Sequence, residues 1–131
     1  VAEVDLGDGS IGFVLSDDLA EVEPAPPTAV LLPELDPTLM GWKQREWYLG
    51  PHAQHLFDSN GNGGQTVWWD GRIVGGWHQR PDGAIGLHLL EKVGRTAVEA
   101  ARARARDLER FLGEARPKPG YPAPFHKTLS G

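Results

Sequence analysis

Arginines recur along residues 95–112 at spacings that place them on one side of a predicted helix. Four of them fall within about 80° of one another at about 100° per residue, away from the apolar side. They are Arg95, Arg102, Arg106 and Arg110. Guanidinium groups in such a row can bind phosphate oxygens. The alternative is an ordinary solvated helix face, because Glu99, Asp107 and Glu109 dilute the positive potential.

Aromatic residues offer a second kind of chemistry, because the chain has five tryptophans whose ring faces could stack on bases or sugars. In a chain of this size, tryptophans are more often part of the core. Trp68 and Trp69 are adjacent on a predicted strand and must point to opposite faces. At least one of them therefore needs cover from outside its own sheet, and we treat both as a candidate interaction surface.

No residue pattern predicts catalysis, a metal or a cofactor. His52 and His55 could share a helical face, but nothing near them supplies further ligands. The stretch DSNGNGG at residues 58–64 could cradle an anion, yet it lacks the Lys-Ser or Lys-Thr ending of a phosphate loop. We expect an exposed loop with several residues at positive φ, capped by the Asp58 carboxylate.

Composition limits the classes of function. The 131 residues suit one domain, and a formal charge of −5 argues against a free-standing nucleic-acid clamp. The absence of cysteine excludes disulfides, thiolate metal sites and cysteine nucleophiles. No apolar run is long enough to span a membrane, so we expect a cytoplasmic protein with no membrane partner. Because the chain opens at Val1 within a predicted strand, we expect a fragment of a longer protein.

The first 23 residues predict a hairpin, formed by residues 1–6 and 11–15 around a GDGS turn, followed by a short helix that Ser16 would cap. Residues 24–28 predict a linker, since the run PAPP removes backbone donors and fixes φ. Beyond it we expect a strand at 29–32 and a helix with Pro37 at its first position. Residues 43–57 predict a broken helix with its aromatic residues inward. These are Trp42, Trp47, Tyr48 and Phe57, together with Leu56.

The dipeptide Asp70-Gly71 predicts a tight hairpin between QTVWW and RIVGGWHQ, and the turn at 80–83 adds a third antiparallel strand. Residues 95–112 predict the one long helix, ended by Gly113. Its apolar stripe consists of Val98, Ala101, Ala105, Leu108 and Leu112. The tail at 114–131 predicts an extended segment from which Tyr121 and Phe125 fold back onto the body.

The stretches LLPELDPTLMGW and VWWDGRIVGGW, with the arginine-rich helix, resemble the C-terminal portion of the actinobacterial winged-helix DNA-binding-domain proteins. Those proteins are similar to DNA glycosylases that unhook interstrand crosslinks. The resemblance implies that residues 1–23 are the wing hairpin of a truncated winged-helix unit. It implies that residues 29–113 are a small β-barrel-like domain with its closing helix. The family's Gln-hydrophobic-Gln or Gln-hydrophobic-Asp pair lies upstream, and His78-Gln79-Arg80 is not that motif, so no catalytic residue carries over.

We therefore predict an α+β fold with a small antiparallel, partly closed sheet, short aromatic helices and one long C-terminal helix behind a wing-like hairpin. The resemblance favours an accessory domain of a winged-helix DNA-binding protein that lines a cleft for double-stranded DNA. Its candidate phosphate contacts are Arg72, Arg80, Arg102 and Arg106. One alternative is a fragment of a DNA glycosylase for alkylated or crosslinked bases, inert by itself. Another is a structural module that forms a homo-oligomer through Trp68 or Trp69.

Overall fold

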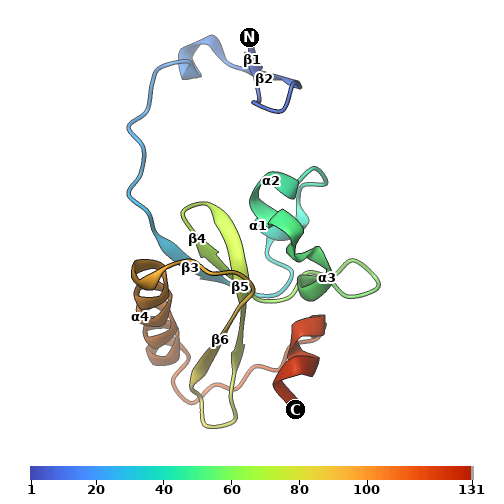
Figure 1. The fold of residues 1–131 in the computed structure, drawn as a ribbon, viewed down its shortest axis with the longest axis vertical. Coiled ribbons are helices and arrows are strands. Elements are labelled where there is room, and N and C mark those ends of the chain that lie inside the picture. The colour runs from blue at the N-terminus through green and yellow to red at the C-terminus, as the bar shows by residue number, and fades with distance from the viewer. Residues whose placement is uncertain (131) are drawn as a thin grey trace.

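The N-terminal residues form a two-stranded hairpin. In the computed structural model, which describes residues 1–130, β1 (Ala2–Asp5) pairs with β2 (Ile11–Val14), as their alternating pattern predicts. A single 3-10 turn, η1 (Ser16–Asp18), follows, and Ser16 begins this turn instead of capping a helix. Residues 19–28 are exposed and have no regular structure, which confirms the break predicted from the proline run. Figure 1 shows this linker running from the hairpin to the main sheet.

The main sheet has four antiparallel strands in the order β3-β4-β5-β6. They are β3 (Ala29–Leu32), β4 (Thr66–Trp69), β5 (Arg72–Gln79) and β6 (Ile85–Leu89). The predicted tight turn joins β4 to β5, with φ of 49° at Asp70 and 79° at Gly71. Two consecutive residues at positive φ match the right-handed twist of the strands, which is why Asp-Gly suits this turn.

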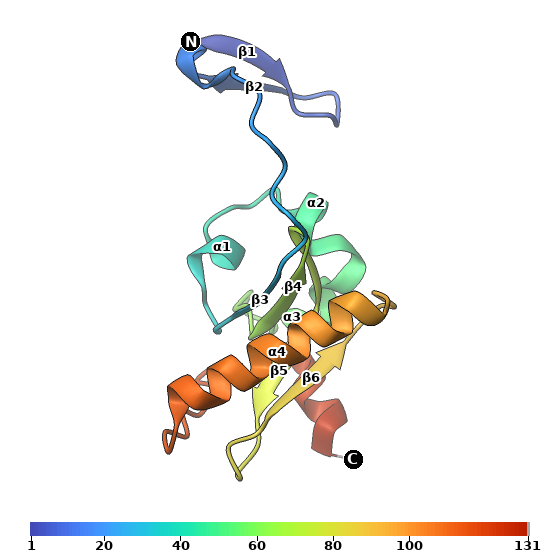
Figure 2. The same cartoon turned by 90° about the vertical axis from the view of Figure 1, so that its left-hand side faces the viewer.

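The sheet is open, so the barrel-like closure predicted from the sequence is wrong. β3 and β6 are its two edges and do not pair with each other. Four strands of four to eight residues are too few to circle a packed interior, since small barrels need about five strands or more. The two faces are instead covered by helices, as Figures 1 and 2 show.

Short helical segments cover one face. They are α1 (Pro37–Met40), α2 (Glu46–Leu49), η2 (Gly50–His52) and α3 (Ala53–Leu56). The Asp36 carboxylate caps α1 by accepting from the Thr38 N–H at 2.9 Å, and Pro37 occupies the first helical position as predicted. Leu39, Tyr48 and Leu56 pack here against Trp68.

Two of the aromatic residues predicted to face inward do not. Trp42 is 60% exposed and Trp47 is 76% exposed, whereas Tyr48 and Leu56 are buried as expected. The helix is broken at Gly50 and Pro51 into single turns, so α2 presents only Tyr48 and Leu49 to the sheet. Trp42 lies in the bend before α2, outside any helix that could aim it inward.

The long helix α4 (Arg95–Leu112) crosses the opposite face of the sheet (Figure 2). Its bounds and its end at Gly113 are those predicted. Ala101 and Ala105 are buried against the sheet, and Leu108 and Leu112 pack beside them. Small residues at the centre of the stripe let the helix approach the strands closely.

The glycine-rich loop at 58–64 is only partly exposed, which corrects its prediction. Gly61 is its one residue at positive φ, and Gly63 and Gly64 are buried. A Cβ on Gly64 would lie 2.5 Å from the Ala123 Cβ, so glycine here provides room for the C-terminal segment. Asp58 does cap the loop, because its carboxylate accepts from the backbone N–H groups of Asn60 and Asn62.

The C-terminal segment is not extended throughout, since it ends in a 3-10 helix, η3 (Pro124–Ser130). Phe125 folds back and is buried, as predicted, whereas Tyr121 is 46% exposed, contrary to the prediction. No helix formed by residues 1–130 has both the length and the hydropathy needed to cross a bilayer.

Candidate functional site

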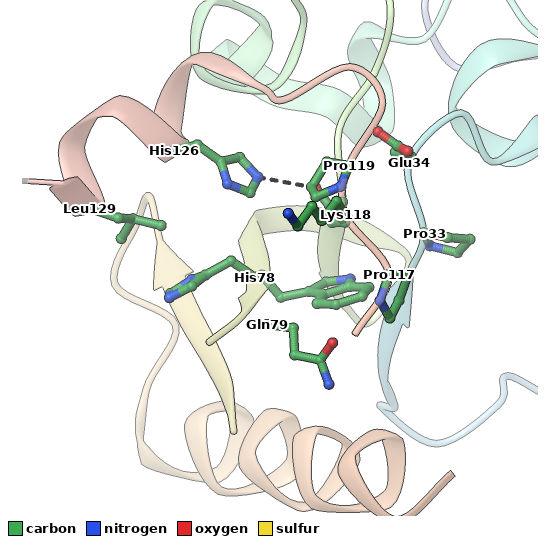
Figure 3. A pocket seen from close by; sticks show the side chains of 11 residues that line it. Pro33, Glu34, His78, Gln79, Pro117, Lys118, Pro119, His126 and Leu129 are labelled. Carbon is green, nitrogen blue, oxygen red and sulfur yellow. Dashed lines mark hydrogen bonds between the residues drawn. The ribbon is translucent and has the colours of Figure 1, made fainter. Parts of the chain in front are cut away.

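A cavity of about 400 Å³ opens between the end of β5 and the C-terminal segment (Figure 3). Its apolar lining comes from the Trp77 ring, Leu129 and three prolines of two segments, 33 and 117–119. Its polar lining includes Gln65, His78, Gln79, Lys118 and His126. Volume and lining are those of small-ligand sites, in which apolar walls carry a few convergent polar groups.

The two histidines of the cavity have lowered pKa values, which favours their neutral forms at pH 7. Burial lowers the pKa of His78, and the charges of Arg80 and His88 add to that effect. Burial also lowers the pKa of His126, helped by His78 and opposed by Glu34. The centroids of the His78 and His126 rings are 6.4 Å apart, close enough for a charge on His78 to disfavour a proton on His126.

Gln65 positions His126, because the His126 Nε2 lies 3.1 Å from the Gln65 Oε1. The amide oxygen can only accept, so this nitrogen carries the proton of the neutral ring. His78 lies close against Gly86, where a Cβ would come within 2.2 Å of the His78 Cε1. Within residues 1–130, the buried His78 Nδ1 and Gln79 Oε1 have no hydrogen-bond partner. Such a site can donate and accept hydrogen bonds, but its neutral rings bring no fixed charge.

The C-terminal segment is held over the cavity by an acid from the main body. The Glu34 carboxylate accepts from the backbone N–H groups of Gly120 and Tyr121, at 2.8 and 3.0 Å. This site was not predicted from the sequence. Its residues come from segments around 34, 65, 78 and 126, and no local spacing relates them. The only indications in the sequence are the histidines themselves.

Two of the four predicted phosphate contacts lie together. Arg102 and Arg106 are exposed and one helical turn apart on α4, and neither makes an ion pair within the described residues 1–130. The other arginines of that predicted row have acidic partners. Arg95 pairs with Glu99, and Arg110 pairs with Asp107. Acidic side chains therefore offset the positive charge at both ends of the arginine row, whereas the charges of Arg102 and Arg106 in its middle are not offset.

The other two predicted contacts lie apart from this pair and from each other. Arg72 begins β5 and Arg80 follows its last residue, so about 26 Å of strand separates them. Arg72 forms an ion pair with Glu91, whose carboxylate also lies 3.6 Å from the His52 Nε2. The four arginines thus form no single cluster.

The tryptophans predicted as an interaction surface are largely covered. Trp68 is 8% exposed and stacks on Tyr48, with 5.3 Å between ring centroids. Trp69 packs against the cluster on the opposite face, which confirms that the two point to opposite sides. The cover that Trp68 needs comes from the aromatic helical segment of this same chain.

The histidine pair at 52 and 55 does not converge. His52 is buried beside Glu91, whereas the His55 Nε2 lies 3.2 Å from the Gln54 Nε2. In the part of the chain that the structure describes, no group of three or more His, Asp or Glu side chains could hold a metal ion.

The family follows from comparison with known proteins. A family model described as DNA glycosylase AlkZ-like matches residues 1–113, from the hairpin to the end of α4. The chain belongs to this family. It matches no curated protein and no solved structure. AlkZ-like membership confirms the glycosylase-like similarity predicted from the sequence, while the winged-helix and actinobacterial parts of that resemblance stay predictions.

Charge is unevenly distributed along this AlkZ-like chain. Residues 1–23 contain seven acidic residues and no Lys or Arg. Residues 24–131 contain thirteen Lys and Arg against eleven acidic residues. The net charge of −5 therefore arises wholly in residues 1–23, and the remaining chain is slightly basic.

Proposed function

We propose that this member of the AlkZ-like family acts in DNA repair as part of a DNA glycosylase for alkylated or crosslinked bases. The observation that carries the proposal is the family match, which covers both sheets and α4. It favours the glycosylase hypothesis over an accessory domain of a DNA-binding protein without catalysis.

Within that enzyme, we assign to this chain the binding of the DNA backbone. Arg102 and Arg106 support the assignment, since both are exposed and have no acidic partner in residues 1–130. Guanidinium groups one turn apart suit adjacent phosphates, which position a protein on DNA without reading sequence. Arg72 and Arg80 are proposed as outlying contacts. The slightly basic body, and not the acidic hairpin, is the side that DNA would approach.

No catalytic residue is assigned to this chain. Base removal requires access to the damaged nucleotide, either within the base stack or extruded from it. It also requires a group that activates water or stabilises the sugar cation. The neutral histidines of the cavity lie beneath the C-terminal segment, apart from Arg102 and Arg106 on α4. We propose that the chain alone binds DNA without excising bases. Residues 1–23 would complete a winged-helix unit that carries the catalytic pair.

The test combines excision with binding. A protein that joins this chain to the family's upstream portion is incubated with duplex DNA carrying an alkylated purine or an interstrand crosslink, and base release is measured. We expect release by that protein and none by residues 1–131. Release by neither, from DNA that is bound, would overturn the enzymatic proposal.

The DNA-facing assignment is tested separately by charge reversal. Arg102→Glu with Arg106→Glu should weaken duplex binding and reduce the slope of log affinity against log salt by about 2. Lys92→Glu with Lys127→Glu is the matched control, because it makes the same change in net charge at two exposed lysines outside α4, and it should change the slope less. Equal effects of both changes would show that α4 does not face DNA.

A further inference from the structure

Two tryptophans stand out because they belong to no part of the core. Trp42 and Trp47, called here the tryptophan pair, are 60% and 76% exposed. Neither lines the cavity under the C-terminal segment, and neither belongs to a buried cluster. A large aromatic side chain left in water forgoes the free energy of burial, so two within six residues mark a contact surface.

Trp47 contacts a series of packed aromatic rings. Its ring meets Tyr48 edge-on, with centroids 4.8 Å apart and an interplanar angle of 85°. Tyr48 stacks in turn on Trp68 of β4, and its hydroxyl donates to the Thr38 carbonyl at 3.1 Å. Because these neighbours are buried, Trp47 is held on a rigid base. A partner that stacks on it need not order it first.

The bend that carries Trp42 is also fixed. The Arg45 guanidinium donates to the Leu39 carbonyl at 2.8 Å and lies 4.3 Å from the centroid of the Phe57 ring. These contacts tie the residues between α1 and α2 to the core. Both tryptophans therefore project from backbone that is anchored, although their own rings are open to solvent.

The charge around the pair suits a polyanion. Between Asp36 and Asp58 the chain has a single acid, Glu46, against Lys43 and Arg45. Lys43 is exposed and follows Trp42 directly. This segment contrasts with the hairpin, whose residues include no Lys or Arg to attract phosphates.

We infer that the tryptophan pair is a stacking surface for unpaired DNA bases. The inference rests on the proposed glycosylase function, because excision or extrusion of a base leaves neighbouring bases unstacked. Open indole faces beside a lysine favour stacking with any base, since every base has a π-face and every nucleotide a phosphate. Bases in an intact duplex are already stacked on each other, so the surface discriminates in favour of gapped DNA.

The experiment compares the affinities of the full chain for an intact duplex and for the same duplex with a short single-stranded gap, at low salt, by fluorescence anisotropy. We expect wild type to prefer gapped DNA. Trp47→Ala and Trp42→Ala should each reduce that preference about tenfold. Trp→Phe at either position should retain most of it, whereas Trp→Leu, which is apolar without a π-face, should lose it. Phe13→Ala is the matched control, because Phe13 is 68% exposed on β2, in the hairpin that we do not assign to DNA contact.

If wild type binds intact and gapped duplexes equally well, the inference fails while the DNA function stands. If wild type prefers gapped DNA and the Ala and Leu variants do not, with unchanged unfolding midpoints, the inference holds. If all variants keep the preference, the tryptophan pair is not a stacking surface, while the DNA function stands. If Leu serves as well as Trp, or if sedimentation shows that the tryptophans join two copies of the chain, the inference is overturned. If wild type binds neither DNA, the proposed DNA-binding role fails and the inference fails with it.

Discussion

Phe125 lies directly over Gly76, and the two fit together only because Gly76 has no side chain. A Cβ on Gly76 would lie 2.5 Å from the Phe125 Cε1. The same ring stacks with His88, with centroids 5.6 Å apart. Phe125 is thus part of the core of the sheet, although it lies beyond the residues that the family model matches.

Gly76→Ala should therefore destabilise the protein by about 1–3 kcal/mol, since a methyl group would overpack the site beneath the Phe125 ring. Urea unfolding measures the effect. In a double-mutant cycle with Phe125→Ala, the cost of the added methyl should largely disappear, because the ring that it meets is gone. Additive effects of the two changes would show that Phe125 does not pack on Gly76.

A feature of the fold could be predicted from the sequence where residues close together in the chain determine it. The turn at Asp70-Gly71 was predicted correctly because these two residues favour positive φ. The helix through Ala101 and Ala105 was predicted correctly because its apolar residues recur at three- and four-residue steps. The exposure of Trp47 was not predictable. It depends on the direction in which α2 faces after the helix breaks at Gly50 and Pro51. Gly64 was predicted to lie in an exposed loop but is buried, and the segment that packs on it lies far along the chain.

The candidate site shows the same limit. The exposed Arg102 and Arg106 follow from helical periodicity, which sequence displays directly. The contact between Gln65 and His126 depends on the C-terminal segment folding back across the sheet. No periodicity or spacing encodes that contact, so the cavity could be found only from the structure.

Glu34→Gln should loosen the C-terminal segment without unfolding the sheet. The carboxylate accepts from two backbone N–H groups, whereas a neutral amide accepts more weakly and presents one oxygen only. We expect a loss of about 1 kcal/mol, seen as faster amide exchange at Gly120 and Tyr121. Glu21→Gln, in the exposed linker, is the control. Unchanged exchange at both amides would contradict the proposed role of the Glu34 hydrogen bonds in holding the C-terminal segment.

Stability should fall as the pH is lowered from about 7 to 5, in part through His78 and His126. Their folded-state pKa values lie below the unfolded value of about 6.5, so the unfolded chain binds more protons in this range. Their contribution is complete above the unfolded pKa and is lost as the pH falls through the folded pKa. Urea midpoints across this pH range measure it.

His126→Gln and His78→Asn should each make that pH dependence shallower, because each removes one of the groups that titrates. His55→Gln serves as the control, since His55 lies outside the cavity. A pH profile of the two cavity variants as steep as that of wild type would mean that other groups govern the loss of stability.

Neutralising the acidic residues of η1 and the linker should strengthen DNA binding by the chain. Asp17→Asn, Asp18→Asn, Glu21→Gln and Glu23→Gln together change the net charge from −5 to −1. These side chains are exposed and make no ion pair within residues 1–130, so the fold should be unaffected. Lower repulsion of phosphates should raise duplex affinity by about tenfold at low salt, and the gain should vanish at high salt. Four neutralised acids on the main body, Glu46, Asp70, Asp82 and Glu114, give the same net charge. If this control variant gained as much affinity as the variant of η1 and the linker, the gain would reflect total charge and not the acidity of the N-terminal residues.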